Sequence, residues 1–152
     1  MIPVITLAAY SNTGKTTYLS SLIPCLKAAG LRVAVIKHDG HEFQIDQEGK
    51  DTWRFAQAGA DVVAITSASK FAIMEYRPID INALIEKISG VDLIILEGYK
   101  QGPYPKIALY RAASGKELAI PSRNAWPLSA TRPWRLPVPC LPWRTRRVWR
   151  IS

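Results

Sequence analysis

The chain has 152 residues, of which 48% are hydrophobic and 21% are charged, a composition typical of a globular domain with an apolar core. No apolar run approaches the roughly 20 residues of a membrane-spanning helix, and the N-terminus carries no basic segment followed by an apolar signal core. Cys25 and Cys140 have neither metal-ligand spacing nor a disulfide pattern. We therefore expect a cytoplasmic protein in which Cys25 belongs to the core.

The net charge of +8 is concentrated at the end of the chain. Residues 1–118 carry 13 Lys and Arg against 12 Asp and Glu, whereas residues 119–152 carry seven Arg and no acid. The latter segment also holds six of the 11 prolines and four of the five tryptophans. The sequence therefore predicts a domain of nearly balanced charge at residues 1–118, followed by an irregular basic tail at residues 119–152.

Strand and helix patterns alternate along residues 1–118, an order typical of parallel βαβ units. Apolar runs between turn residues predict strands, and apolar residues three and four apart predict helices. By these criteria the strands lie at residues 2–8, 31–36, 61–66, 71–75, 93–96 and 106–110, and the helices at 15–29, 50–58 and 80–88. We expect an α/β fold, with a mostly parallel sheet flanked by helices.

The segment after the first predicted strand has the pattern of a phosphate-binding P-loop. Residues 9–17 read A-Y-S-N-T-G-K-T-T, which matches G-x-x-x-x-G-K-[ST] with Ala9 in the place of the first glycine. The backbone N–H groups of such a loop and the N-terminus of the next helix bind phosphate oxygens, while the lysine reaches the β- and γ-phosphates. The predicted phosphate-binding residues are Ser11, Asn12, Thr13, Gly14, Lys15, Thr16 and Thr17.

A second signal of P-loop chemistry is an acid at the end of another apolar strand. P-loop proteins use such an acid to hold Mg²⁺, directly or through water. Glu97 follows the apolar run 93–96, and ligands bind at the carboxyl ends of strands in open α/β sheets. We therefore assign Thr16 and Glu97 to a Mg²⁺ site. The alternative is an exposed glutamate at a strand end.

A polar segment follows the second predicted strand on the same edge of the sheet. Its candidate functional residues are Lys37, His38, Asp39, His41, Asp46 and Asp51. Side chains of these types can bind a metal, position water or contact an anionic ligand. The spacing fits no specific zinc pattern, and we interpret the segment as a switch or partner loop that responds to nucleotide or Mg²⁺. A transition-metal site and a solvated polar loop are the alternatives.

Together these residues resemble the molybdopterin-guanine dinucleotide biosynthesis protein B family over about residues 2 to 111. The matching strings are Y-S-N-T-G-K-T-T, V-A-V-I-K-H-D-G-H-E-F-Q-I-D with G-K-D-T-W-R-F-A-Q-A-G-A, and D-L-I-I-L-E-G-Y-K with P-K-I-A-L-Y-R. The resemblance implies a GTP-binding P-loop protein with weak Mg²⁺-dependent GTPase activity, usually a homodimer. Such a protein assists the guanylyltransferase that joins GMP to molybdopterin. On this resemblance Lys37, His38, Asp39 and His41 lie beside the nucleotide or the pterin partner.

The chain departs from the family's pattern in two places. The family usually has an acid where Ala108 stands, and residues 119–152 lack its further strand and its last, acid-flanked helix. A shifted reading frame would explain both the surplus of Arg, Pro and Trp and the missing acids. GC-rich codons for residues 123–136 and 143–152 can encode family-like text in another register. The alternative is a basic, aromatic arm that binds RNA or an acidic membrane.

Two other functions stay open on the residues alone. A P-loop small-molecule kinase would transfer a phosphoryl group from ATP to a metabolite, with Asp39 as a candidate base. A nucleic-acid-binding module would use the basic tail, and its RNA affinity would fall steeply with salt. No N-K-x-D or T-K-x-D string marks guanine recognition, so the expectation of GTP rests on the resemblance.

Overall fold

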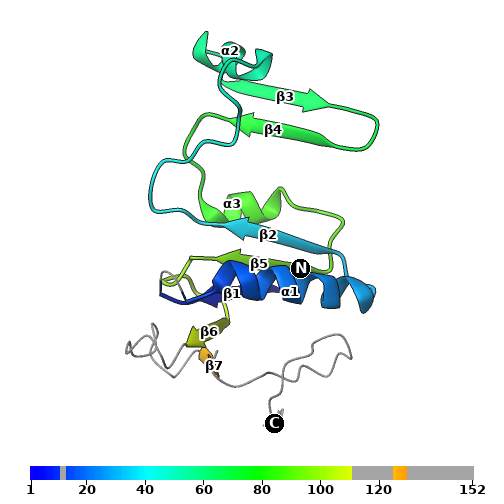
Figure 1. Cartoon of the computed structure of the whole chain (residues 1–152), viewed down its shortest axis with the longest axis vertical. Coiled ribbons are helices and arrows are strands. Elements are labelled where there is room, and N and C mark those ends of the chain that lie inside the picture. Colours follow the sequence, from blue (N-terminus) through cyan, green and yellow to red (C-terminus); the bar gives the residue numbers. More distant parts are fainter. Residues whose placement is uncertain (11–12, 111–124, 130–152) are drawn as a thin grey trace. The chain divides into compact units, whose positions relative to one another are not determined.

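The chain forms two compact units. The computed structural model describes residues 1–10, 13–110 and 125–129. The first unit comprises residues 1–38 together with the chain from residue 88 onward, and the second comprises residues 39–87 (Figure 1). The second unit is therefore inserted into the sequence of the first. The predicted boundary at residue 118 falls outside the described residues and stays a prediction.

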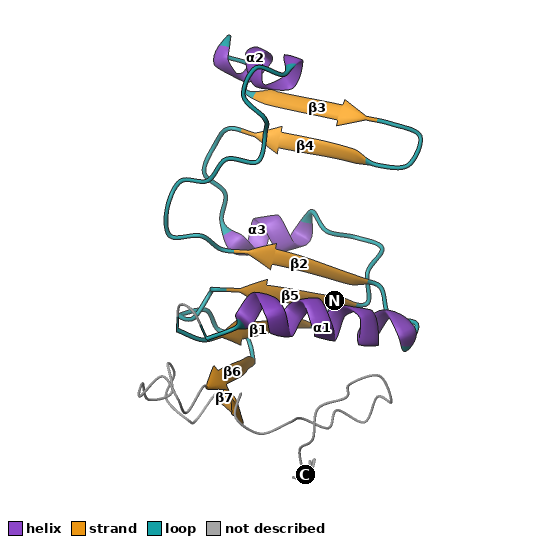
Figure 2. Ribbon diagram, viewed as in Figure 1, coloured by secondary structure: helices purple, strands orange, loops and turns teal. Residues whose placement is uncertain are grey.

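The first unit is built on a parallel sheet. Among the described residues this sheet has five strands in the order β2-β5-β1-β6-β7, and every neighbouring pair is parallel (Figure 2). The strands are β1 (Val4–Ala8), β2 (Val33–Lys37), β5 (Leu93–Glu97), β6 (Lys106–Tyr110) and β7 (Ala125–Ser129). The predicted α/β fold with a mostly parallel sheet is confirmed.

Helix α1 (Lys15–Ala28) lies across one face of this sheet (Figure 1). Its predicted apolar stripe is confirmed, because Leu19, Leu22 and Cys25 are buried. Cys25 is thus a core residue, as expected. The core cluster joins this stripe to strand residues and consists of Leu7, Ala9, Leu19, Leu22, Ile95 and Leu109. None of the helices in the described ranges is long and apolar enough to cross a bilayer.

The centre of strand β5 is deeply buried. Ile94, Ile95 and Leu96 are each at most 1% exposed. The wholly apolar run is typical of a strand of a parallel sheet that is buried on both faces, and β5 lies inside the sheet between β1 and β2. The register places Leu7 of β1 and Lys37 of β2 opposite Glu97. Three strands therefore end in one row at the carboxyl edge.

The second unit contains an antiparallel hairpin rather than another parallel crossover. Its elements are α2 (Asp51–Gln57), β3 (Val62–Thr66), β4 (Phe71–Glu75) and α3 (Ile81–Glu86). Strands β3 and β4 pair only with each other, with Thr66 opposite Phe71. These two strands therefore lie outside the mostly parallel sheet that the sequence predicted. The physical reason is the connection: Ser67 N–H donates to the Lys70 carbonyl (2.8 Å), and so short a turn joins antiparallel strands.

Strand β7 lies in the segment predicted to be irregular. The structure pairs Ala125–Ser129 with β6 in parallel, with Pro127 opposite Ala108. Pro127 argued against a strand in this segment, because proline cannot donate a ladder hydrogen bond. Such a residue is tolerated at a sheet edge, where the strand order places β7. The rest of residues 119–152, and with it the reading-frame hypothesis, lies outside the described residues.

Candidate functional site

The P-loop segment connects β1 to α1 at the carboxyl edge of the sheet. Ala9 is buried at 1% exposure, and Gly14 is the N-cap of α1 in a left-handed conformation (φ 91°, ψ 24°). A glycine suits this position because other residues rarely adopt a positive φ. Thr13 is also buried, and its Oγ1 donates to the Tyr10 carbonyl (2.7 Å). Ser11 and Asn12 lie outside the described residues.

Lys15 folds back onto the loop that precedes it. Its Nζ donates to the Tyr10 carbonyl (2.9 Å) and more weakly to the Ala9 carbonyl (3.4 Å). Partial burial lowers the pKa of Lys15 below its ordinary value; the nearby charge of Glu97 opposes this effect and that of Lys100 adds to it. The ammonium is therefore held beside the helix N-terminus by backbone carbonyls that a phosphate can replace.

The first turn of α1 presents hydroxyl groups and no negative charge. Thr16 and Thr17 are both exposed, and the first turn, which lies wholly within the described residues, contains no acidic residue. The helix dipole and the free N–H groups leave this end partially positive. The arrangement can accept an anion, and the Thr16 hydroxyl is available to a cation bound with it.

Glu97 ends β5 at the same edge. It is half-buried, and it lies close enough to Lys15 to act on the pKa of that lysine. Among the described residues no three or more His, Cys, Asp or Glu gather into a group that could hold a metal ion. The donors therefore do not suit a site made wholly of protein ligands. They suit Mg²⁺, which keeps several waters and binds one or two carboxylates together with substrate phosphates.

The predicted switch or partner segment is divided between the two units. Lys37 ends β2 in register with Glu97, and His38 N–H donates to the Glu97 carbonyl (2.8 Å). The His38 ring meets that of Tyr99 edge-on, with centroids 5.4 Å apart. The structure thus brings Lys37 and His38 beside Glu97 at the carboxyl edge.

The other residues of that segment belong to the second unit, where their described contacts are local. The Asp39 carboxylate accepts from His41 N–H (3.3 Å). Asp46 Oδ1 accepts from the Thr52 hydroxyl (3.0 Å) and from Gln47 N–H (2.8 Å). Asp51 is the acid in the first turn of α2. Asp46 and Asp51 therefore help to shape the chain entering α2.

The segment that follows Glu97, which was not among the predicted site residues, also lies beside the P-loop. Gly98 has φ 92° and lies against the His38 carbonyl. The next residues both face aromatic rings: Tyr99 contacts His38, and the Nζ of Lys100 lies 5.2 Å from the centroid of the Tyr10 ring. The sequence does contain a sign of this contact. Gly98 directly follows a buried strand, and a glycine at such a point marks a bend or a close approach of another backbone segment.

The same segment is tied down at its far end by a buried lysine. Lys106 is 6% exposed, and its Nζ donates to the carbonyls of Gly102 and Tyr104. Pro105 in turn accepts from Thr6 N–H (2.8 Å), which joins the segment to β1. Hydrogen bonds therefore hold residues 98–105 in a defined loop beside the P-loop, which we call the post-β5 loop.

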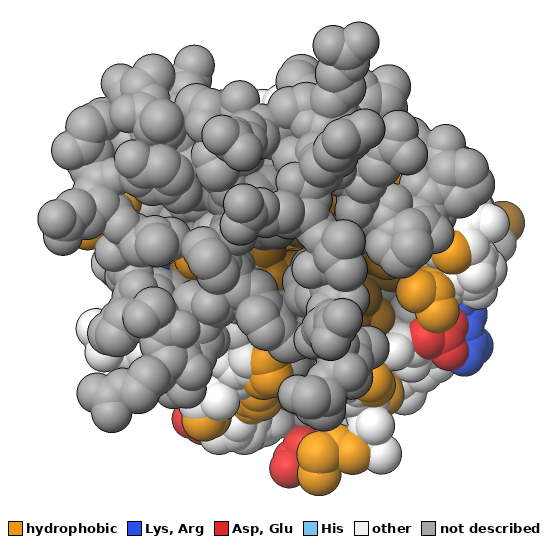
Figure 3. Space-filling view, turned by 90° about the horizontal axis from the view of Figure 1, so that it is seen from below, with side chains coloured by type: hydrophobic (Ala, Val, Ile, Leu, Met, Phe, Trp, Pro, Cys, Tyr) orange, Lys and Arg blue, Asp and Glu red, His pale blue; other side chains and the backbone are white. Residues whose placement is uncertain are grey.

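The charge on the visible described surface is mixed. On the face shown in Figure 3, hydrophobic side chains lie beside a few acidic and basic groups, without a broad basic field. The nucleic-acid-binding alternative would require clustered Lys and Arg. That alternative rests on the tail, most of which lies outside the described residues.

The chain matches the family described as "Molybdopterin guanine dinucleotide synthesis protein B" over residues 4–131. The match extends beyond residue 111, where the resemblance in motifs stops, and it includes β7. The statement that residues 119–152 do not match is therefore corrected for residues 119–131.

Curated relatives and solved structures agree with this match. A molybdopterin-guanine dinucleotide biosynthesis adapter protein of Haemophilus influenzae is 42% identical over 121 residues, covering 77% of this chain and 68% of the relative. The protein of the same description from Escherichia coli is 40% identical over 129 residues (79% and 74%). The crystal structure of Bacillus subtilis MobB superposes with a TM-score of 0.68 at 27% identity, covering 86% and 91% of the two chains. The chain thus belongs to the molybdopterin-guanine dinucleotide synthesis protein B family.

Proposed function

We propose that this protein binds GTP at its P-loop and serves as an adapter in molybdopterin-guanine dinucleotide biosynthesis. The observation that carries the proposal is the position of Lys15, held by the Tyr10 carbonyl at the N-terminus of α1 and beside Glu97. The adapter role is the one printed for the relatives from Haemophilus influenzae and Escherichia coli. The residues of the site support phosphate binding, whereas the choice of guanine rests on the resemblance to the family.

In this proposal Mg²⁺ joins the nucleotide at Thr16 and Glu97. The ion would offset charge on the β- and γ-phosphates, which is its usual contribution to phosphoryl transfer. Lys15 and the backbone N–H groups of the loop offset the remaining charge. Only Glu97 among these groups is an acid, so we expect slow hydrolysis at most. Weak GTPase activity is therefore part of the proposal.

The nucleotide proposal is tested by titrating the full chain with GTP and with ATP, each with and without Mg²⁺. We expect GTP to bind more tightly than ATP, and Mg²⁺ to strengthen binding. Lys15→Ala should abolish binding, whereas Lys27→Ala, which alters an exposed lysine in the last turn of the same helix, should not. Unchanged GTP affinity in Lys15→Ala would contradict the P-loop assignment.

The partners in this proposal are the molybdenum cofactor guanylyltransferase and its molybdopterin substrate. The test is the rate at which the purified guanylyltransferase forms molybdopterin-guanine dinucleotide with and without this protein. We expect a faster rate with the wild-type chain and no increase with Lys15→Ala. Phosphoryl transfer from ATP to a small metabolite, with no effect on the guanylyltransferase, would instead support the kinase alternative.

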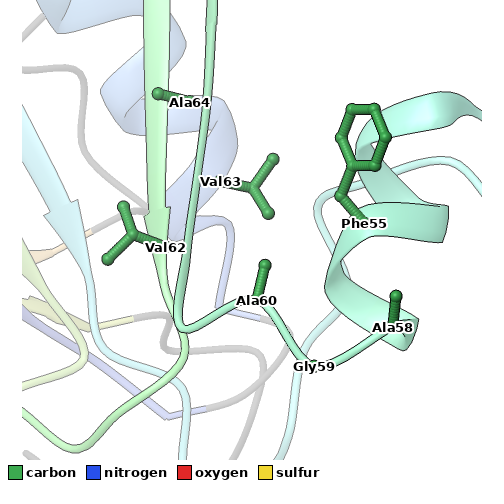
Figure 4. A pocket seen from close by; sticks show the side chains of 7 residues that line it. All are labelled: Phe55, Ala58, Gly59, Ala60, Val62, Val63 and Ala64. Atoms are coloured by element: carbon green, nitrogen blue, oxygen red, sulfur yellow. The ribbon is translucent and has the colours of Figure 1, made fainter.

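We also propose a homodimer that uses the second unit. In Figure 4, Val63 points to the side of Phe55 of α2, and Val62 and Ala64 point to the other side. A hollow of about 560 Å³ lies on the α2 side, lined by Phe55, residues 58–60 and residues 62–64. The opposite face of the hairpin carries exposed Val62, Phe71 and Ile73.

Such a hairpin gains stability when its apolar face is covered. An isolated two-stranded sheet is marginally stable in water, and its unpaired edges favour pairing with another chain. We expect Ile73→Glu to convert the dimer to a monomer in sedimentation equilibrium. Lys70→Glu, in the turn of the same hairpin, should leave the dimer intact. A wild-type chain that sediments as a monomer would overturn this proposal.

A further inference from the structure

The post-β5 loop directs one lysine toward the P-loop. Gly98 turns the chain immediately after Glu97, and Lys100 N–H donates to the Gly98 carbonyl (2.9 Å). Gly102 packs so closely on the Tyr99 ring that a Cβ there would lie 2.3 Å from a ring carbon. Because Tyr99 is also held against His38, the backbone on both sides of Lys100 is fixed by packing.

A single P-loop residue, Tyr10, contacts both Lys15 and Lys100. The Tyr10 carbonyl accepts from Lys15 Nζ at 2.9 Å, and the Tyr10 ring lies 5.2 Å from Lys100 Nζ. A cation over a tyrosine ring is attracted by the negative face of the ring. Tyr10 therefore brings two ammonium groups together from segments 85 residues apart in the sequence.

Two neighbouring ammonium groups repel each other, and this repulsion is relieved by a polyanion. The charge of Lys100 acts to lower the pKa of Lys15, which agrees with their proximity. Glu97 is the acid that acts in the opposite direction. With Mg²⁺ on that carboxylate, two lysine charges would remain for phosphate oxygens.

We propose that Lys100 is a second phosphate-binding lysine, which binds the phosphate chain of the nucleotide together with Lys15. The Tyr10 ring holds it ready when the site is free of ligand. This inference rests on the proposed function in that it needs a polyphosphate ligand at the P-loop. It adds to that function a residue outside the P-loop motif and a role for the aromatic side chain of Tyr10.

The test measures the affinity of the full chain for GTP and for inorganic tripolyphosphate by calorimetry at two salt concentrations. Because Lys100→Met removes charge-assisted hydrogen bonds, we expect it to lower the affinity for both ligands by about 10- to 100-fold. The affinity of Lys100→Met should also fall less steeply with salt than that of the wild type, because one ionic contact is missing. Lys100→Arg should retain most of the affinity. Lys27→Met, on an exposed lysine of α1, should match the wild type.

The outcomes separate the two proposals. If the wild type binds GTP and Lys100→Met binds it equally well, the role of Lys100 is overturned and the GTP proposal stands. If the wild type binds tripolyphosphate but not GTP, guanine recognition fails, and a loss in Lys100→Met still supports the second lysine. Binding of neither ligand overturns both. Equal circular dichroism spectra and melting temperatures of the variants ensure that a loss of binding is not a loss of folding.

Discussion

Gly98 lies against the backbone of His38: a Cβ added to Gly98 would stand 2.6 Å from the His38 carbonyl oxygen. The two residues follow β5 and β2, which are neighbouring strands that end in register. His38 N–H also donates to the Glu97 carbonyl. The close approach therefore fixes how both chains leave the sheet beside the P-loop.

We predict that Gly98→Ala destabilises the protein more than Gly90→Ala does. Both glycines have positive φ (92° and 71°), but nothing lies within 4 Å of a Cβ at Gly90. Gly90→Ala should therefore cost about 1–2 kcal/mol from backbone strain alone. Gly98→Ala should cost about 1–3 kcal/mol more from overpacking. Urea unfolding measures both, and equal losses would contradict the contact with His38.

The second prediction concerns the pH dependence of phosphate binding. Because burial lowers the pKa of Lys15 below 10.5, its ammonium loses its proton at a lower pH than an exposed lysine does. Tripolyphosphate affinity should therefore fall as the pH rises through this lowered value. Lys15→Arg should keep its affinity to higher pH, because guanidinium stays charged. Superimposable pH profiles of the wild type and Lys15→Arg would show that Lys15 does not bind the phosphates in its charged form.

The third prediction concerns an ion pair at the other edge of the sheet. Asp92 Oδ2 accepts from Arg32 N–H (2.7 Å) and Oδ1 lies 3.1 Å from the guanidinium. The Arg32 hydrogen bonds hold the pKa of Asp92 below its ordinary value of 3.8. A lowered carboxyl pKa contributes stability above the unfolded value, and this stability is lost as the pH falls through the folded value.

Asp92→Asn should therefore lower the melting temperature at pH 7, and its difference from the wild type should shrink as the pH falls below about 3.8. Glu86→Gln removes one exposed negative charge elsewhere and serves as the matched control. We expect little change in its melting temperature at either pH. A loss in Asp92→Asn that is independent of pH would mean that the charge of Asp92 does not contribute.

The fourth prediction tests the start of α3. Asp80 caps this helix: its Oδ1 accepts from Asn82 N–H (2.8 Å) and from Ala83 N–H (3.4 Å). Asp80→Ala should cost about 1 kcal/mol of stability, whereas Asp80→Asn should be close to neutral because it retains the acceptor. Urea unfolding of the three proteins would show this order. Equal losses in the two variants would mean that the charge matters more than the cap.

Local sequence patterns predicted the positions of the helices and strands well, because these positions depend mainly on residues close together in the sequence. Leu19 and Leu22 follow the helical period, Asp80 caps the helix that it was expected to start, and the apolar run 93–96 lies in a strand with a buried centre. The P-loop pattern likewise predicted that Gly14 and Lys15 open a helix. In each case the signal lies within a few residues of the structure that it predicts.

Partners distant in sequence were not predictable in the same way. An apolar run such as 62–66 indicates a strand but not its neighbour, so the pairing of β3 with β4 was missed. The contact of Lys100 with Tyr10 depends on the path of the post-β5 loop, which Gly98, Gly102 and Lys106 fix together. No period or spacing encodes such a path, since it arises from packing between segments far apart in the chain.

The strand order also has a consequence for synthesis of the chain. Strands β1 and β2 leave the ribosome first, but β5 lies between them in the sheet, with Ile94 opposite Val4 and Leu93 opposite Val33. A nascent chain that ends before residue 93 contains β1 and β2 but lacks the strand that lies between them. Their backbone edges stay open to other chains during that interval. A ribosome that slows before β5 would therefore expose the newborn protein to aggregation.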